Sequence, residues 1–99
     1  MELADKIAVA ETIYLYAMGI DTKDFVLYRS IFADTVEIDF SSYEGSSVTE
    51  PSQLRGDKWV RRVQPLFTGL AATQHSMTNP MVSIDGDTAT CRMYMQAHH

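Results

Sequence analysis

The amino-acid sequence predicts a single α+β domain spanning residues 1–99, and three observations support this prediction. Apolar residues recur at helical spacing in the first twenty residues and again between residues 57 and 67. A run of alternating apolar and polar residues, typical of a half-buried strand, lies between these two regions. Near the end of the chain an Asp-Gly pair separates two strand-like runs, which is a strong signal for a β-hairpin. Helices segregated from an antiparallel sheet define an α+β fold.

The N-terminal region predicts two helices. The first is expected from Glu2 to about Ile20, and Gly19 is expected to end it, because glycine commonly follows the last helical turn. Asp21 or Thr22 is then expected to cap a second helix over residues 23–33. The apolar stripe of the first helix comprises Leu3, Ile7, Ala10 and Tyr14, and is widened by Ile13, Tyr16 and Met18.

The middle of the chain predicts a strand, a loop and a third helix. Residues 34–43 alternate between apolar and polar side chains, which places Val36, Ile38 and Phe40 on a buried face. Residues 41–56 have the composition of a loop. Asp57 is expected to cap the third helix, whose end Pro65 makes irregular. The apolar face of this helix consists of Trp59, Val60, Val63, Leu66 and Phe67.

The hairpin predicts which residues of its two strands share a face. Asp85 and Gly86 are expected to be the central turn residues, so that Ile84 pairs with Asp87. Directly opposed residues lie on the same face, and so do residues two apart on one strand. A slip of one residue would exchange the faces, and Pro80, which cannot donate to a ladder, marks a plausible bulge.

In this register two of the three histidines share a face. His75 is expected opposite Gln96, and His98 is then its diagonal neighbour at about 7–8 Å between backbones. Tyr94 and Met77 are expected on the same face. The opposite face of the last strand carries an apolar row, which consists of Ala89, Cys91, Met93, Met95 and Ala97.

Composition excludes several classes of protein. A hydrophobic share of 45% and a charged share of 21% are those of an ordinary globular domain. Eight basic and thirteen acidic residues give a net charge of −5, which argues against a nucleic-acid surface. A single cysteine, Cys91, excludes an intrachain disulfide and predicts a cytoplasmic setting. The start of the chain has neither the pattern of a signal peptide nor the uninterrupted apolar run of a membrane span.

Four segments of the chain resemble a known family. "YAMGIDTKDF", "LYRSIFADTVEIDF", "TQHSMTN" and "IDGDTATCRMYMQAHH" are similar to the SnoaL-like domains of the nuclear transport factor 2-like superfamily. Within that superfamily they look most like the branch of scytalone dehydratase and bile-acid dehydratase. The resemblance covers almost the whole chain. It implies a cone, in which a curved antiparallel sheet packs on N-terminal helices around a ligand cavity.

The resemblance also implies assembly and a longer sheet. Such proteins commonly form dimers or higher homo-oligomers through the outer sheet face, a role that fits the row Met93, Met95 and Ala97. Family members usually continue beyond the "AHH" strand with further strands that complete the cone. The chain is therefore expected to be C-terminally short: it is a fragment, or a partner supplies the missing wall, or the cavity is open.

Carried over by position, the resemblance implies a polar cluster of Asp21, His75 and His98, in which the aspartate orients a histidine that moves a proton. Tyr16 lies five residues before Asp21, as a tyrosine does in the bile-acid dehydratase pattern. The tyrosine pair of scytalone dehydratase is absent, since Ile20 and Phe40 stand at those positions. The cavity lining is expected to comprise Phe40, Trp59, Phe67, Met77, Asn79 and Tyr94.

Each of these residues also has a structural interpretation. Asp21 can cap the second helix, and His75 can be an ordinary strand histidine with hydrogen-bonded neighbours. His98 and His99 can be a frayed end or the remains of a tag, and Asn79 can lie at a bulge. Two histidines and one carboxylate also form a known iron-binding set. A metal site is not predicted, because the family that the chain resembles is not generally metal-dependent and the histidine spacing within single elements does not support one.

Two functions therefore stay open. The first is an enzyme without a cofactor, a dehydratase, isomerase or cyclase that acts by His–Asp acid–base chemistry on a hydrophobic ring compound such as a polyketide or steroid. His75 would remove a proton next to a carbonyl, and Tyr16 or His98 would stabilise the oxyanion. The second is a non-catalytic module of the same fold, used for ligand binding or oligomerisation.

Overall fold

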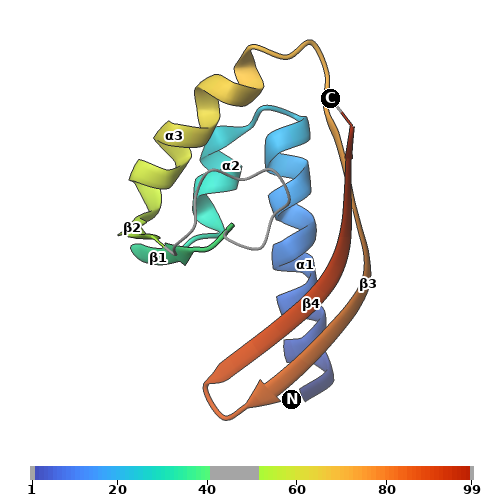
Figure 1. The fold of residues 1–99 in the computed structure, drawn as a ribbon. Coiled ribbons are helices and arrows are strands. Elements are labelled where there is room, and N and C mark those ends of the chain that lie inside the picture. Colours follow the sequence, from blue (N-terminus) through green and yellow to red (C-terminus); the bar gives the residue numbers. More distant parts are fainter. Residues whose placement is uncertain (1, 41–51, 99) are drawn as a thin grey trace.

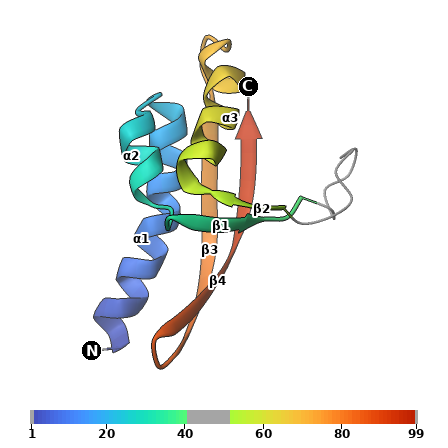
Figure 2. The ribbon, with the colours of Figure 1, turned by 90° about the vertical axis from the view of Figure 1, so that its left-hand side faces the viewer.

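A computed structural model describes residues 2–40 and 52–98 of the chain. Helix α1 stands between two parts of the molecule, with α2 and α3 on one side and the long hairpin of β3 and β4 on the other (Figure 1). A short ladder of β1 and β2 runs across the direction of that hairpin (Figure 2). The predicted α+β class is confirmed. The elements are α1 Glu2–Asp21, α2 Phe25–Ser30, β1 Thr35–Ile38, β2 Ser52–Arg55, α3 Gly56–Thr68, β3 Gln74–Asp85 and β4 Thr88–His98.

The most buried side chains lie where the C-terminal end of α1 meets α2, β2 and α3. Ile20 and Tyr28 have no exposed surface, and Tyr28 also accepts a hydrogen bond from the indole Nε1–H of Trp59 at 3.1 Å. Burying the Tyr28 hydroxyl is tolerated because this bond satisfies it. The core consists of Ala17, Ile20, Tyr28, Leu54, Trp59, Val60 and Val63.

Helix α1 ends in a left-handed turn. Lys23 takes a φ of 56°, and its backbone N–H donates to the carbonyl of Ile20 at 3.0 Å. The N–H of Asp24 donates to the carbonyl of Gly19 at 2.9 Å. This pair of bonds is a Schellman motif, which satisfies carbonyls of the last turn. The predicted stop at Gly19 is therefore wrong, because the helix continues to Asp21.

Helix α2 is capped by a different residue from the two predicted. The side chain of Asp24 accepts a hydrogen bond from the N–H of Leu27 at 3.0 Å. The prediction of Asp21 or Thr22 as the cap is wrong, because a turn of three residues separates the end of α1 from the start of α2. The carboxylate of Asp21 thus remains available for contacts outside the helices.

At Gly19 helix α2 packs closely on α1. A Cβ atom at this position would lie 2.8 Å from the Cβ of Tyr28 and 2.9 Å from its Cα. We expect Gly19→Ala to lower the free energy of unfolding by about 1–3 kcal/mol, because the two helices must move apart. Urea denaturation measures this loss.

Gly69→Ala provides the matched control for that substitution. A Cβ there meets only the carbonyl oxygen of Pro65 at 3.6 Å, and Gly69 has a φ of −75° that alanine adopts readily. Its stability should be unchanged or slightly raised, because alanine restricts the unfolded chain. Equal losses in the two variants would show that the close approach at Gly19 is not the cause.

The middle of the chain departs from the prediction at two places. Residues 52–55 were expected in a loop, but Ser52–Arg55 forms β2 and pairs with β1, with Leu54 buried opposite Val36. Three of its four residues are polar, so the sequence carries no strand pattern. Asp57 does not cap α3, which begins at Gly56 after Arg55; it lies in the first turn, where its charge complements the helix dipole. The predicted strand residues 41–43 lie outside the described part of the chain.

The hairpin turn lies one residue later than predicted. Asp85 pairs with Thr88, so Gly86 and Asp87 are the central residues. Gly86 has a φ of 59°, which is the conformation that a type II′ turn requires at its first central position. The pairing near the turn is therefore displaced by two residues, with Ile84 opposite Ala89. A displacement of two leaves the assignment of faces unchanged.

A bulge at Asn79 and Pro80 then exchanges the two faces. Thr78 pairs with Tyr94 and Met81 with Arg92, so that two residues of β3 oppose one of β4. The predicted bulge at Pro80 is confirmed, and Asn79 takes a φ of 57°, which asparagine tolerates better than most residues. Beyond the bulge every predicted pairing is displaced by one residue, and this inverts the predicted faces.

Two predictions about faces are therefore wrong. His75 lies opposite Ala97, and Gln74 lies opposite His98, so the two histidines occupy opposite faces of the hairpin. Tyr94 and Gln96 share the face of His98. The row Met93, Met95 and Ala97 lies on the face of His75, which packs toward α1, and not on the outer face expected for dimer contacts. Homo-oligomerisation itself stays a prediction.

Candidate functional site

A carboxylate and an imidazole meet where α1 ends and β3 begins. Asp21 Oδ1 lies 2.7 Å from His75 Nδ1, and Asp21 Oδ2 accepts the backbone N–H of His75 at 2.8 Å. Thr73, in the segment before β3, donates its hydroxyl to Asp21 Oδ1 at 2.9 Å. The imidazole side chain is 4% exposed and the carboxylate 19%. Three donors thus fix one carboxylate against the start of the strand.

The contact determines which nitrogen of His75 carries a proton. Burial acts to raise the pKa of Asp21, but hydrogen bonds from the backbone and ring of His75 and from Thr73 outweigh it and lower that pKa below its ordinary value of 3.8. The carboxylate is therefore ionised at neutral pH, and an ionised carboxylate only accepts hydrogen bonds. The proton must lie on Nδ1, which leaves Nε2 as the basic nitrogen of neutral His75.

The lowered pKa of Asp21 predicts acid-sensitive stability. Folding favours the ionised carboxylate, so its contribution is fully present above about pH 3.8 and is lost as the pH falls through the folded-state pKa. We expect Asp21→Asn, which has no carboxyl to titrate, to lose stability less steeply than the parent protein between about pH 4 and pH 2. Thermal unfolding across that range measures both slopes. Parallel slopes would contradict the prediction.

Aromatic rings surround the imidazole of His75. The ring of Tyr16 on α1 meets it edge to face at a centroid distance of 6.4 Å, and Phe67 on α3 lies at 5.8 Å. Tyr16 in turn lies 5.3 Å from Tyr28. Burial raises the pKa of Tyr16, and interaction with the Tyr28 hydroxyl acts the other way to a smaller extent. Tyr16 is therefore a neutral O–H donor at neutral pH.

The structure brings together only part of the predicted site. Asp21, His75, Tyr16 and Phe67 form one cluster, and Met77 shares the face of His75. Trp59 reaches this cluster through Tyr28, and Phe40 stacks on Trp59 at 6.0 Å. The predicted neighbourhood of His98 and His75 is wrong, because the bulge places His98 on the other face.

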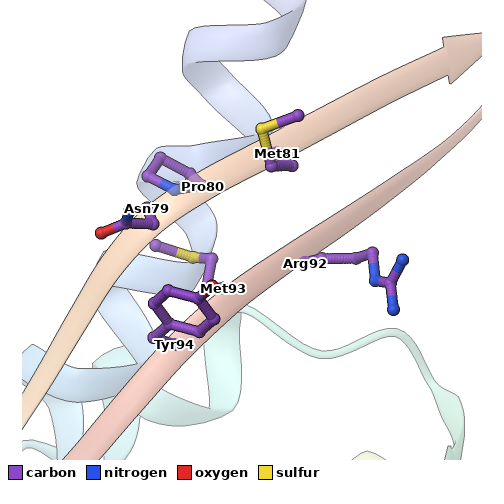
Figure 3. Close-up of a pocket in the computed structure, with 6 residues that line it drawn as sticks. All are labelled: Asn79, Pro80, Met81, Arg92, Met93 and Tyr94. Atoms are coloured by element: carbon purple, nitrogen blue, oxygen red, sulfur yellow. The ribbon is translucent and has the colours of Figure 1, made fainter.

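Tyr94 and Asn79 belong to a different part of the hairpin. They border a hollow of about 560 Å³ at the bulge, together with Pro80, Met81, Arg92 and Met93 (Figure 3). Arg92 extends away from the other five side chains in this view. Two smaller hollows lie between α1 and the hairpin, one along Ile7 and Val82 and one near the turn at Gly86. Asp21 and His75 line none of these three hollows.

Three residues that contribute to the site were not predicted from the sequence: Thr73, Tyr28 and Lys23. Thr73 is two residues before His75, so its position on the same side of the chain was the available signal. Tyr28 lies within the predicted second helix, but its contact with Tyr16 depends on how α1 and α2 cross. Lys23 donates its Nζ to the carbonyl of Leu70, a contact between distant segments for which the sequence carries no signal.

Neither a metal site nor a membrane-spanning helix occurs among the described residues. Within residues 2–40 and 52–98, no group of three or more His, Cys, Asp or Glu side chains is arranged to hold a metal ion. The two-histidine, one-carboxylate set does not form, since His98 faces away from Asp21. In the same ranges no helix combines the length and hydropathy needed to cross a membrane.

Helices packed on a curved antiparallel hairpin give this chain the α+β fold of the nuclear transport factor 2-like class. Within that class, the chain belongs to the SnoaL-like family, whose domain model matches residues 1–99. This family includes polyketide cyclases and isomerases. No functionally curated protein matches the chain.

A solved structure gives the same fold. The crystal structure of the Kfla4162 protein from Kribbella flavida superposes with a TM-score of 0.87 at 28% sequence identity. The match covers 98% of the present chain and 64% of the Kribbella chain. The chain therefore spans just under two thirds of the length of this relative.

Proposed function

We propose that this domain is a cofactor-independent enzyme that moves a proton next to a carbonyl group of a hydrophobic ring compound. The observation that carries the proposal is the 2.7 Å contact between Asp21 Oδ1 and His75 Nδ1, which makes Nε2 the base. A carboxylate that orients an imidazole and stabilises its protonated form is the usual arrangement for a histidine general base. Dehydration, isomerisation and cyclisation all begin with such a proton transfer.

The reaction balances without a metal or redox partner. Nε2 of His75 takes the proton from the carbon next to the carbonyl. The C–H electron pair forms the carbon–carbon double bond of an enolate, and the π pair of the carbonyl moves onto its oxygen. Tyr16 is the side chain that would donate to that oxygen. The imidazolium then returns the proton to carbon or to a leaving hydroxyl, which departs as water. Asp21 keeps its negative charge throughout.

The surroundings of His75 favour an apolar substrate. The ring is 4% exposed and is flanked by Tyr16 and Phe67, so little water competes for the reacting atoms.

Deuterium uptake tests this function even when the product is unidentified. We expect the protein in D₂O at neutral pH to accelerate exchange of the proton next to the carbonyl in at least one compound from a panel of aromatic polyketide-type and steroid ketones. Mass spectrometry measures the uptake, and ultraviolet absorbance reports any loss of water. Binding of panel members without any exchange would contradict the enzyme and support a non-catalytic ligand-binding module.

A further inference from the structure

Asp21 Oδ1 is shared by two donors of different kinds. It accepts the ring Nδ1–H of His75 at 2.7 Å and the hydroxyl of Thr73 at 2.9 Å. The other oxygen, Oδ2, accepts the backbone N–H of His75 at 2.8 Å. The proton-transfer chemistry uses only the ring contact, so the hydroxyl of Thr73 has no part in the reaction itself.

The hydroxyl changes what the carboxylate can do. Without this hydroxyl only the two N–H groups of His75 would hold the carboxylate, and rotation about its Cβ–Cγ bond would move Oδ1 away from the imidazole. Because Asp21 is 19% exposed, water can also compete for Oδ1. A hydroxyl that occupies the second acceptor direction of Oδ1 limits both movements, as outer hydrogen bonds do for other orienting carboxylates.

The segment that carries Thr73 is itself attached to the end of α1. Lys23, in the left-handed turn with a φ of 56°, donates its Nζ to the carbonyl oxygen of Leu70. The backbone N–H of Leu70 donates to the carbonyl of Phe67 at 3.2 Å. The turn that ends α1 thus follows Asp21 directly and is bonded, at Leu70, to the segment that leads to Thr73.

We propose that Thr73 is a positioning residue, whose hydroxyl holds Asp21 Oδ1 against His75 Nδ1 and which Lys23 keeps in place through Leu70. The effect of Thr73 on catalysis rests on the proposed function. Its structural content does not depend on a substrate, because the state of the Nδ1–H bond is measurable in the free protein.

Proton NMR of the His75 Nδ1–H tests the role of Thr73. We expect Thr73→Val, which keeps the shape and removes the hydroxyl, to speed exchange of this proton with water about tenfold, in line with the loss of a hydrogen bond to a charged group. Thr73→Ser retains the hydroxyl and should exchange nearly as slowly as the parent protein. Unchanged exchange in Thr73→Val, or equally fast exchange in Thr73→Ser, would overturn the proposal.

Two further variants complete the test. Thr68→Val removes a hydroxyl that donates to the Gln64 carbonyl of α3, and should leave the exchange unchanged. Lys23→Met should accelerate exchange in the same direction as Thr73→Val, whereas Lys23→Arg should not. The two Lys23 variants test the proposal even if Thr73→Val does not fold. If the Nδ1–H proton of Lys23→Met exchanges as slowly as that of the parent protein, the attachment of Thr73 through Leu70 is contradicted.

The catalytic readout separates failure of this proposal from failure of the function. If the enzyme is active, Thr73→Val should lower kcat for deuterium uptake about tenfold with little change in KM, because a positioning residue acts through Asp21 and His75 and not on substrate binding. An inactive parent protein with slow Nδ1–H exchange would refute the function and leave the exchange test of Thr73 intact. An active parent protein with unchanged Thr73→Val exchange would refute the proposal alone.

Discussion

His75→Asn should lower deuterium uptake into a ketone substrate by about 10²–10⁴-fold, the range that general acid–base groups contribute. Asparagine keeps an N–H donor near the position of Nδ1, so it can still bond to Asp21, but it offers no basic nitrogen in place of Nε2. The variant therefore removes the proposed base and retains the contact that stabilises the start of β3. Single-turnover mass spectrometry measures the loss.

His98→Asn is the matched control for this prediction. His98 is the last residue of β4 and pairs with Gln74, on the face of the hairpin opposite to that of His75. Its replacement should leave the rate within about a factor of two of the parent protein, because a side chain on that face does not reach the proposed base. Full activity in His75→Asn, or an equal loss in His98→Asn, would remove His75 from the mechanism.

Tyr28→Ala should lower the free energy of unfolding by about 3–5 kcal/mol, as expected for an aromatic side chain removed from a core. Tyr28 has no exposed surface, and its ring packs against Tyr16, Phe25 and Phe32 at centroid distances of 5.0–6.3 Å. A domain of this size has a total stability of roughly 5–15 kcal/mol. The variant should therefore be partly unfolded at about 37 °C, and thermal unfolding monitored by circular dichroism measures the change.

One further substitution separates packing from hydrogen bonding at Tyr28, and another, on the exposed side of α3, serves as the control. Tyr28→Phe keeps the ring but leaves the Trp59 Nε1–H without its acceptor, which should cost about 1–3 kcal/mol. Leu66→Ala on the exposed side of α3 should change stability by less than about 0.5 kcal/mol, since Leu66 is 66% exposed. A loss in Tyr28→Ala no larger than that in Leu66→Ala would contradict the placement of the core.

Local patterns in the sequence predicted the first and third helices well, whereas the second was predicted over residues 23–33 and is shorter, Phe25–Ser30. The 3.6-residue spacing of apolar residues placed α1 and α3 within one or two residues of their observed ends. The contact between Asp21 and His75 was expected from the family resemblance and not from spacing, because 54 residues separate the partners. Its geometry depends on the Schellman turn, which frees Asp21 from capping α2.

The pairing of the hairpin could not be derived from its pattern. Gly86 fits both an Asp-Gly turn and a Gly-Asp turn, and the two registers differ by two residues. The bulge at Asn79 and Pro80 adds one further residue, which reverses the faces of the distal half. Since both faces carry polar and apolar residues, burial alone did not indicate the correct register, and His98 was misplaced.

The short strand β2 and the contacts of Thr73 and Lys23 were missed for a different reason. Their partners are determined by how distant segments pack: β2 pairs with β1, and Lys23 reaches Leu70 across 47 residues. Such contacts follow from tertiary structure, which overrides local preference in short polar segments. The contacts that position His75 are therefore the part of the site that local sequence predicts least.

The protonation of the His75 ring tests the central claim most directly. In a two-bond ¹H–¹⁵N correlation spectrum of neutral His75, Nδ1 should appear protonated and Nε2 unprotonated, because Asp21 accepts from Nδ1 at 2.7 Å. That result would establish Nε2 as the basic nitrogen of the ring. A protonated Nε2 with a bare Nδ1, or a mixture of both forms equal to that of a free histidine, would contradict the account.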